Sequence, residues 1–184
     1  MMLDINEIDK NWTLFLDRDG VINYEKQNDY IHTWSEFKFY EGVLEAMTIF
    51  SKRFKHIVVV TNQRGIGKGV TKEEDVIYLH KKMKESVEKN GGRIDRVYYC
   101  RDIDSSSPCR KPNIGMALQA VEDLPTIDLT KAIMIGNTLS DMKFGRNLEI
   151  KTVFLPTTRP EVNLKDENID AVFPSLIAFA NHML

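Results

Sequence analysis

Two carboxylates and a glycine follow the first apolar run of the chain. Asp17 and Asp19 are separated by one residue, and Gly20 comes next. In an extended backbone the side chains of Asp17 and Asp19 face the same way. One carboxylate of such a pair can attack as a nucleophile while the other transfers protons, and a cation can keep both ionised. The alternative interpretation is a turn, in which Asp and Gly are common.

Polar side chains and glycines follow the second apolar run. Thr61, Asn62 and Gln63 come first, and three glycines lie within residues 65–69. A hydroxyl, side-chain amides and the N–H groups of a glycine-rich loop are typical donors to phosphate oxygens. The loop is not a Walker A motif, because a glycine rather than Ser or Thr follows Lys68. A flexible β–α loop is the alternative interpretation.

Basic residues follow the third apolar run, and an amide and a carboxylate follow the fourth. Arg110 and Lys111 precede Pro112, which we place in the first turn of the next helix. Because the helix dipole disfavours cations at this end, the basic pair predicts an anion nearby. Asn137 and Asp141 offer the oxygen ligands that Mg²⁺ prefers. The alternatives are a solvated basic pair, a helix cap at Asn137, and an Asp141 that complements the helix dipole.

The elements that must position these residues are short apolar runs alternating with helical patterns. Strands are predicted at residues 12–16, 56–61, 94–100, 131–136 and 151–155, and helices at 42–54, 114–121, 139–147 and after Pro174. A longer helix is predicted to begin at Thr71, with a capping box closed by Glu74, and to end at Gly91 and Gly92. Residues 156–170 are polar and predict a surface loop before a last strand and helix.

This alternation indicates an α/β fold of Rossmann-like type, a central parallel sheet with helices on both faces. In open α/β sheets, ligands bind beyond the carboxyl ends of the strands. All four polar segments fall at such ends, in chain order. A nucleophilic carboxylate, a hydroxyl, a lysine and a magnesium site together predict phosphoryl transfer through an aspartyl phosphate.

Composition narrows the class of protein. The chain has 184 residues, 42% hydrophobic and 28% charged, which suits one domain over residues 1–184. A formal net charge of −2 argues against a nucleic-acid partner. Two cysteines are too few for a disulfide framework and suit a reducing compartment. No signal peptide or membrane span is predicted, so we expect a cytoplasmic monomer without a membrane partner.

These motifs resemble those of haloacid dehalogenase (HAD) superfamily phosphatases. The order Asp17-x-Asp19-Gly, then Thr61, Lys111 and the segment from Gly136 matches the four motifs of that superfamily over about residues 12–155. Within it, the chain resembles the branch of heptose-1,7-bisphosphate 7-phosphatases and histidinol phosphatases. The segments that carry this likeness are 15–23, 61–69 and 109–112, with 29–32 and 39–47 on the heptose side.

The resemblance implies a Mg²⁺-dependent phosphatase and assigns roles to the site. Asp17 is then the nucleophile and a metal ligand, while Asp19 is the general acid/base and a ligand through its backbone carbonyl. Thr61 and Lys111 would hold the phosphoryl group and offset its developing charge. Arg110 would contact the distal part of a small sugar phosphate or amino-alcohol phosphate.

Further residues are expected around the substrate. Asn62, Gln63 and Tyr30 are candidates for substrate contacts. Trp34 could line the site with Tyr30, although packing explains either aromatic at least equally well. The resemblance places a flap at residues 24–30. The short intervals between motifs leave no room for a separate cap domain, so loops 24–35 and 101–110 are expected to gate an open site.

Three features depart from the family pattern or lack a role in it. Asn137 stands where the family has a metal-binding Asp, so we predict weaker Mg²⁺ binding, with Asp141 as a further ligand. Asp102 and Ser107 stand where heptose-branch relatives carry His and Cys ligands, so we predict no structural Zn²⁺. Cys100 and Cys109 are then interpreted as small, partly buried side chains.

The histidines, at 32, 56, 80 and 182, share no ligand spacing and are interpreted as incidental.

Four functions remain open at this point. The favoured one is hydrolysis of D-glycero-D-manno-heptose 1,7-bisphosphate. The second candidate is a histidinol-phosphate phosphatase, because those enzymes share the first three motifs. The third is a polynucleotide 3′-phosphatase, whose second motif resembles residues 61–69. A phosphosugar-binding protein with weak catalysis is the non-enzyme alternative, suggested by Asn137.

Overall fold

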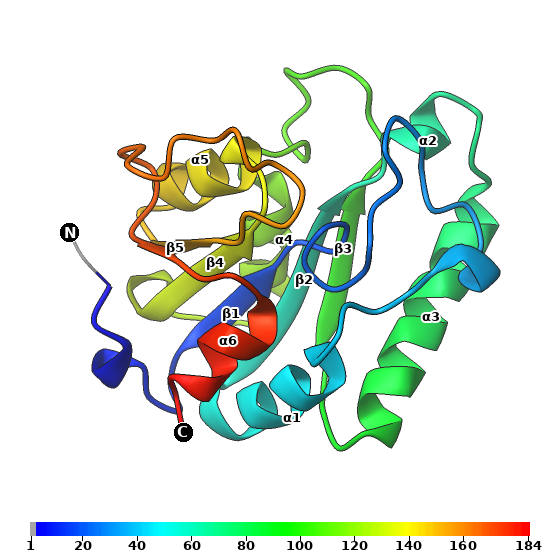
Figure 1. The fold of residues 1–184 in the computed structure, drawn as a ribbon. Helices are drawn as coiled ribbons and strands as arrows, with labels where there is room; N and C mark the ends of the chain where they lie inside the picture. The colour runs from blue at the N-terminus through cyan, green and yellow to red at the C-terminus, as the bar shows by residue number, and fades with distance from the viewer. Residues whose placement is uncertain (1–2) are drawn as a thin grey trace.

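The computed structural model describes residues 3–184 and contains the predicted parallel sheet (Figure 1). Its strands are β1 (Thr13–Leu16), β2 (His56–Asn62), β3 (Arg96–Cys100), β4 (Ala132–Gly136), β5 (Lys151–Phe154) and β6 (Ala171–Val172). They pair in the order β3-β2-β1-β4-β5-β6, and every pair is parallel. Short β-branched and aliphatic runs form these strands because a sheet covered on both faces buries nearly every side chain. The predicted fold class is confirmed.

Helices cover both faces of the sheet. Their bounds are α1 (Val43–Arg53), α2 (Arg64–Gly67), α3 (Glu73–Lys89), α4 (Gly115–Asp123), α5 (Leu139–Asn147) and α6 (Leu176–Asn181). Short 3₁₀ turns lie at Ile5–Glu7, Trp34–Glu36 and Leu129–Lys131. Helices α1, α3 and α6 pack on one face, and α4 and α5 on the other (Figure 1).

The strands divide their side chains between two cores. In β1, Leu14 and Leu16 join the core under α1, α3 and α6, whereas Phe15 joins the core under α4 and α5. Phe15 lies in register with Val58 of β2 and Met134 of β4, which belong to the same core. This alternation fixes the register, because a slip by one residue would exchange the two faces of a strand.

Two helix starts differ from the predictions. Helix α3 begins at Glu73, and its N-cap residue Lys72 makes no side-chain capping bond, so the capping box predicted at Thr71 is wrong. The Thr71 hydroxyl instead bonds to His32 Nδ1 at 2.7 Å. That contact joins segments far apart in the sequence, and Thr71 lies one residue before the N-cap.

Helix α4 begins at Gly115, so Pro112 lies outside its first turn. Turns hold the chain before the helix, with bonds from Arg110 N–H to the Ser107 carbonyl at 3.0 Å and from Asn113 N–H to the Arg110 carbonyl at 2.8 Å. The argument that a helix dipole demands an anion beside Arg110 therefore does not hold.

The interpretation of the two cysteines as separate side chains is also wrong. Cys100, at the end of β3, and Cys109 are joined by a disulfide, because the loop between them returns to the strand and brings their Cα atoms to 5.5 Å. Asp102 lies beside them. The absence of structural zinc stays a prediction. Within residues 3–184, no helix has the length and apolar character needed to cross a bilayer.

Candidate active site

The four motifs meet at the carboxyl ends of the central strands. Strand β1 lies between β2 and β4, and the chain proceeds from β1 toward β3 on one side and from β4 toward β6 on the other. Such a reversal of strand order is where open α/β sheets bind ligands. Asp17 directly follows β1, and its N–H donates to the Ile135 carbonyl of β4 at 3.0 Å. The structure thus brings together residues that the sequence places far apart.

Lys111 lies between two buried carboxylates. Its Nζ donates to Asp17 Oδ1 at 2.8 Å and lies 2.6 Å from Asp141 Oδ1. Its third acceptor is the Val60 carbonyl of β2, at 2.7 Å. An ammonium group carries three N–H donors, so these three acceptors leave no freedom of rotation. Asn62 fixes the Lys111 backbone as well, since its amide accepts from Lys111 N–H at 3.0 Å and donates to Lys111 C=O at 3.2 Å.

The protonation of Asp17 depends on positive charge. Burial raises the pKa of Asp17, Lys111 lowers it, and the charges of Asp141 and Asp19 raise it again, so that together these effects bring the pKa of Asp17 to about 7. The pKa of Lys111 is itself raised, because Asp141 and Asp17 outweigh the burial that lowers it. Lys111 is therefore charged at neutral pH. Asp17 needs one more positive partner to be fully ionised as a nucleophile.

Asp19 is ionised and held by three side chains. Arg18 Nη2, Asn23 Nδ2 and Gln63 Nε2 each donate to its carboxylate at 2.9 Å. Burial is the largest effect and raises the pKa of Asp19, but the charge of Arg18 and these hydrogen bonds lower it below its ordinary value. Gln63 also donates to the Thr61 hydroxyl at 2.9 Å. The Gln63 amide thus couples Asp19 to Thr61, and the substrate contact expected of Gln63 stays a prediction.

Three oxygens converge where the magnesium ligands were predicted. Asn137 has its Nδ2 bonded to Thr158 Oγ1 at 2.6 Å, and its Oδ1 then faces Asp17 Oδ2 and the Asp19 carbonyl. Rotating the amide by half a turn would make it donate to these oxygens, at 3.3 and 3.1 Å. In either orientation the Asn137 amide lies beside Asp17 Oδ2 and the Asp19 carbonyl, and with its oxygen turned toward them the three oxygens could hold a cation. Oxygen donors of this kind are what Mg²⁺ prefers.

Gly20 is required by this arrangement. It has a φ of +85°, and a Cβ atom at this position would lie 2.0 Å from Asn137 Nδ2. A side chain here would be strained and would displace the amide from the site. The Asp17-x-Asp19-Gly motif therefore brings the backbone close enough for Asn137 to reach both the Asp17 carboxylate and the Asp19 carbonyl.

Asp141 does not join these three oxygens. Its Oδ1 pairs with Lys111, and its Oδ2 accepts from Thr138 N–H at 3.0 Å and from Thr138 Oγ1 at 2.7 Å. Thr138 caps α5 in a capping box with Asp141, so Asn137 is not the cap. Both oxygens of Asp141 have partners in the protein, so we expect it to hold Lys111 in place, and its role as a metal ligand stays a prediction.

Replacing Asn137 with Asp is expected to tighten Mg²⁺ binding by about tenfold, because the charge count of the ligands tunes cation affinity. Isothermal titration with MgCl₂ measures this without turnover. Asn6→Asp is a matched control, since it adds the same charge at an exposed residue of the N-terminal 3₁₀ turn. Equal affinities for wild type and Asn137→Asp would contradict the assignment of Asn137 as a ligand.

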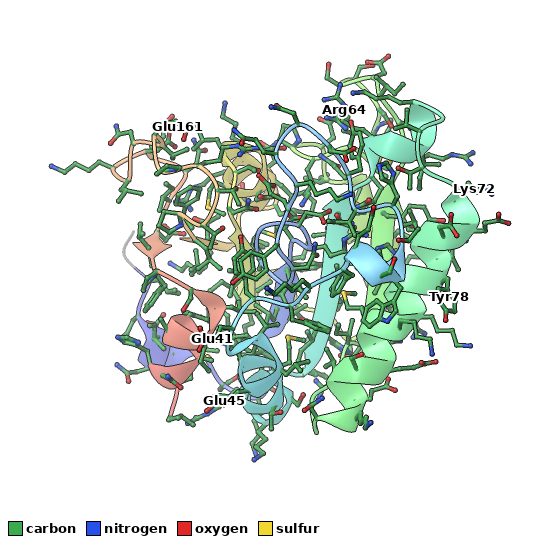
Figure 2. All side chains as sticks on the ribbon, turned by 45° about the vertical axis from the view of Figure 1, so that its right-hand side comes forward. Glu41, Glu45, Arg64, Lys72, Tyr78 and Glu161 are labelled. Carbon is green, nitrogen blue, oxygen red and sulfur yellow. A yellow bond between two sulfur atoms is a disulfide. The ribbon has the colours of Figure 1, made fainter. Side chains whose placement is uncertain are left out.

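A cavity of about 620 Å³ opens beside Asp19. Its lining includes Asn62, Gln63, Arg64 and Lys68 together with parts of segments 25–31 and 159–161. Figure 2 shows Arg64 and Glu161 at the same end of the molecule. Tyr30 lines the cavity as predicted. Trp34 does not, because its ring stacks on Phe37 with the centroids 5.1 Å apart.

Arg64 lines this cavity, and the Arg110 guanidinium lies near Arg64 and Tyr30. Arg110 donates to the Asp102 carbonyl at 3.2 Å, and its pKa is lowered by burial and by the like charge of Arg64. Arg64 Nε is buried and has no hydrogen-bond partner among residues 3–184. Gly67 lies close to the chain that follows β3, since a Cβ atom at Gly67 would lie 2.2 Å from the Arg101 carbonyl. The glycine-rich loop thus packs α2 against the loop after β3.

Sequence reasoning missed Arg64, Arg18 and Thr158 as parts of this site. Arg64 stands within the glycine-rich segment that was singled out, so its charge was a usable signal. Arg18 was not singled out, because the segment was interpreted from the two carboxylates that flank Arg18. Thr158 lies in a segment predicted only as a polar surface loop.

Comparisons with known proteins agree with this geometry. Residues 9–156 match the family model described as polynucleotide kinase 3 phosphatase. A D-glycero-alpha-D-manno-heptose-1,7-bisphosphate 7-phosphatase of Campylobacter jejuni is 38% identical, over 79% of this chain and 83% of that protein. A D-glycero-beta-D-manno-heptose-1,7-bisphosphate 7-phosphatase of Photorhabdus laumondii is also 38% identical, over 84% of this chain and 85% of that protein.

Solved structures support the fold. The crystal structure of D,D-heptose 1,7-bisphosphate phosphatase from B. bronchiseptica, complexed with magnesium and phosphate, aligns with a TM-score of 0.83. It is 24% identical, and the alignment covers 94% of this chain and 97% of that one. The chain therefore belongs to the HAD superfamily of phosphatases, in the family that includes the heptose-1,7-bisphosphate 7-phosphatases.

Proposed function

We propose that this phosphatase hydrolyses one phosphate ester of a small sugar bisphosphate, with D-glycero-D-manno-heptose 1,7-bisphosphate as the favoured substrate. The similarity to the heptose-1,7-bisphosphate 7-phosphatases of Campylobacter jejuni and Photorhabdus laumondii supports this choice. A monomer acting in the cytoplasm is part of the proposal. The cavity beside Asp19 carries both acidic and basic side chains, which suits a polyhydroxylated sugar better than a polyanionic strand.

In the proposed reaction, an Asp17 carboxylate oxygen attacks the phosphorus atom and the bond to the sugar oxygen breaks. Asp19 gives a proton to that leaving oxygen. It then takes a proton from the water that attacks the phosphorus of the aspartyl phosphate, which restores Asp17 and releases inorganic phosphate. Asp19 is ionised in the free protein, so it must take up its proton as substrate binds. The negative charge of an approaching phosphate favours this uptake.

Lys111 and Thr61 are proposed to hold the phosphoryl oxygens during transfer. Lys111 already bonds to Asp17, so it lies where charge develops on the phosphoryl group. Asp17, the Asp19 carbonyl and Asn137 would hold Mg²⁺. When bound, Mg²⁺ supplies charge that stabilises the transferring phosphoryl group and keeps Asp17 ionised.

One observation carries the preference for a bisphosphate. Arg64 and Arg110 lie close enough to lower the pKa of Arg110, and Arg64 Nε is buried without a hydrogen-bond partner among the residues described. Two guanidinium groups that form no ion pair within residues 3–184 are a suitable site for a second phosphate, which a guanidinium binds with two parallel hydrogen bonds.

The substrate is tested by measuring kcat/KM with Mg²⁺ for four compounds side by side. These are the alpha and beta anomers of the heptose bisphosphate, histidinol phosphate and an oligonucleotide with a 3′-phosphate. We expect one bisphosphate anomer to be preferred over the last two by about a hundredfold or more. A preference of that size for histidinol phosphate or for the oligonucleotide would overturn the proposed substrate and leave the reaction class intact.

Removing either guanidinium is expected to weaken binding of the second phosphate alone. Arg64→Ala or Arg110→Ala should raise KM for the heptose bisphosphate by about 10- to 100-fold, the range for a hydrogen bond to a charged group. The kcat/KM for p-nitrophenyl phosphate should stay close to that of wild type. Lys72→Ala is the matched control, because Lys72 is an exposed cation at the start of α3 (Figure 2). Equal losses on both substrates would contradict a second phosphate site.

A further inference from the structure

A buried arginine lies behind the acid/base residue. Arg18 has no exposed surface and ranks among the largest fully buried side chains. Its Nε and Nη2 both donate to Asp19 Oδ1, at 3.3 and 2.9 Å, and Nη2 lies 2.9 Å from Oδ2. A buried charge is costly unless it is paired and hydrogen-bonded. Arg18 therefore depends on its partners to be accommodated in the core at all.

The remaining end of this guanidinium is held by His80. Arg18 Nη1 lies 2.9 Å from His80 Nε2, and His80 is on α3 with 6% of its surface exposed. Arginine can only donate, so His80 Nε2 is the acceptor and carries no proton. Burial, followed by the charge of Arg18, lowers the pKa of His80 to about 3, which keeps the imidazole neutral. The Tyr99 ring packs against it, with the centroids 5.6 Å apart.

We infer that His80 is a positioning residue for catalysis, which holds Arg18 so that Arg18 in turn orients the Asp19 carboxylate. This role would replace the interpretation of His80 as incidental. With Nη1 fixed by His80, the guanidinium plane cannot turn away from Asp19. Asp19 shifts from donor to acceptor during the proposed reaction, and a fixed guanidinium keeps its carboxylate in one place throughout.

If His80 served only to fill space in the core, its replacement would have a different effect. An apolar side chain of similar size would then fill the same space without effect on chemistry. Three features argue against packing alone. The contact is a hydrogen bond, the donor is a charged group, and that charged group bonds directly to the proposed acid/base residue.

The test separates proton transfer from general damage and rests on the acid/base role proposed for Asp19. We compare kcat/KM for the better sugar or histidinol phosphate, whose leaving oxygen needs a proton, with kcat/KM for p-nitrophenyl phosphate, whose leaving group departs as an anion. The variants are His80→Leu, His80→Gln, which keeps an acceptor, and Asp19→Asn. His56→Leu is the matched control, because His56 bonds to Thr126 at the other end of the sheet.

We expect His80→Leu to lower kcat/KM for the alkyl phosphate by about 10- to 100-fold and for p-nitrophenyl phosphate by less than about threefold. His80→Gln should recover most of the loss, and His56→Leu should leave the ratio of the two unchanged. If His80→Leu does not fold, His80→Met replaces it, because a flexible thioether fills the same space.

Two outcomes distinguish the inference from the proposed function. Suppose that Asp19→Asn changes the ratio of the two kcat/KM values. Equal losses on both substrates in the His80 variants, or no recovery in His80→Gln, then overturn the role of His80. A ratio that Asp19→Asn leaves unchanged overturns the acid/base role of Asp19 itself.

Discussion

Replacing Asp17 with Asn is expected to lower kcat by about 10⁴-fold or more, the scale seen when a catalytic nucleophile or its partner is removed. An amide oxygen is a poor nucleophile, so no aspartyl phosphate forms. Asn is close in size to Asp and can still accept the hydrogen bond from Lys111. The fold should therefore survive, and release of phosphate from the preferred substrate measures the effect.

Asp141→Asn is the matched control for this prediction. It removes the other buried carboxylate that pairs with Lys111 and leaves the attacking group in place. We expect a smaller loss of kcat than in Asp17→Asn, because Lys111 keeps one carboxylate partner. An Asp17→Asn protein with the turnover of wild type would refute the nucleophile assignment.

Replacing Lys111 with Met is expected to destabilise the metal-free protein by about 3–5 kcal/mol, the cost of leaving buried charges without their partner. Asp17 and Asp141 would then face each other with no cation between them. The loss should be largest at pH 7 and above and smaller near pH 4. At low pH a carboxyl with a raised pKa is protonated, so Asp17 no longer needs Lys111.

Urea denaturation at several pH values, with and without MgCl₂, measures this effect. Mg²⁺ should recover part of the lost stability in Lys111→Met, because a second cation then faces Asp17. Lys131→Met is the control, since Lys131 is half exposed and lies 4.0 Å from Asp9. We expect it to change the free energy of unfolding by less than about 1 kcal/mol. A similar small change in Lys111→Met would show that the buried pairs carry little energy.

The fold was predictable because its main signals are local. Runs such as Ile57–Val60 are aliphatic enough to identify buried strands, and their alternation with helical patterns indicates a parallel sheet. The start of α3 was not predictable, because Thr71 bonds to His32 rather than capping the helix. The Cys100–Cys109 bond was missed for a similar reason, since it depends on the path of a loop.

The catalytic residues of the site were predictable from the sequence, but the residues that hold them in position were not. The carboxyl-end rule for parallel sheets was enough to bring Asp17, Thr61 and Lys111 together. Sequence spacing carries no information about contacts between distant elements, so the bond from Arg18 to His80 was not foreseen. For the same reason, the contact between the Asn62 amide and the Lys111 backbone was not predicted.

Mass spectrometry of the protein quenched in acid during turnover tests the central claim most directly. We predict that the peptide containing Asp17 gains the mass of one phosphoryl group. Asp19→Asn with p-nitrophenyl phosphate should accumulate more of this species, because the leaving group needs no acid while hydrolysis of the aspartyl phosphate lacks its base. A phosphoryl group on another residue, or none in either protein while phosphate is being released, would contradict attack by Asp17.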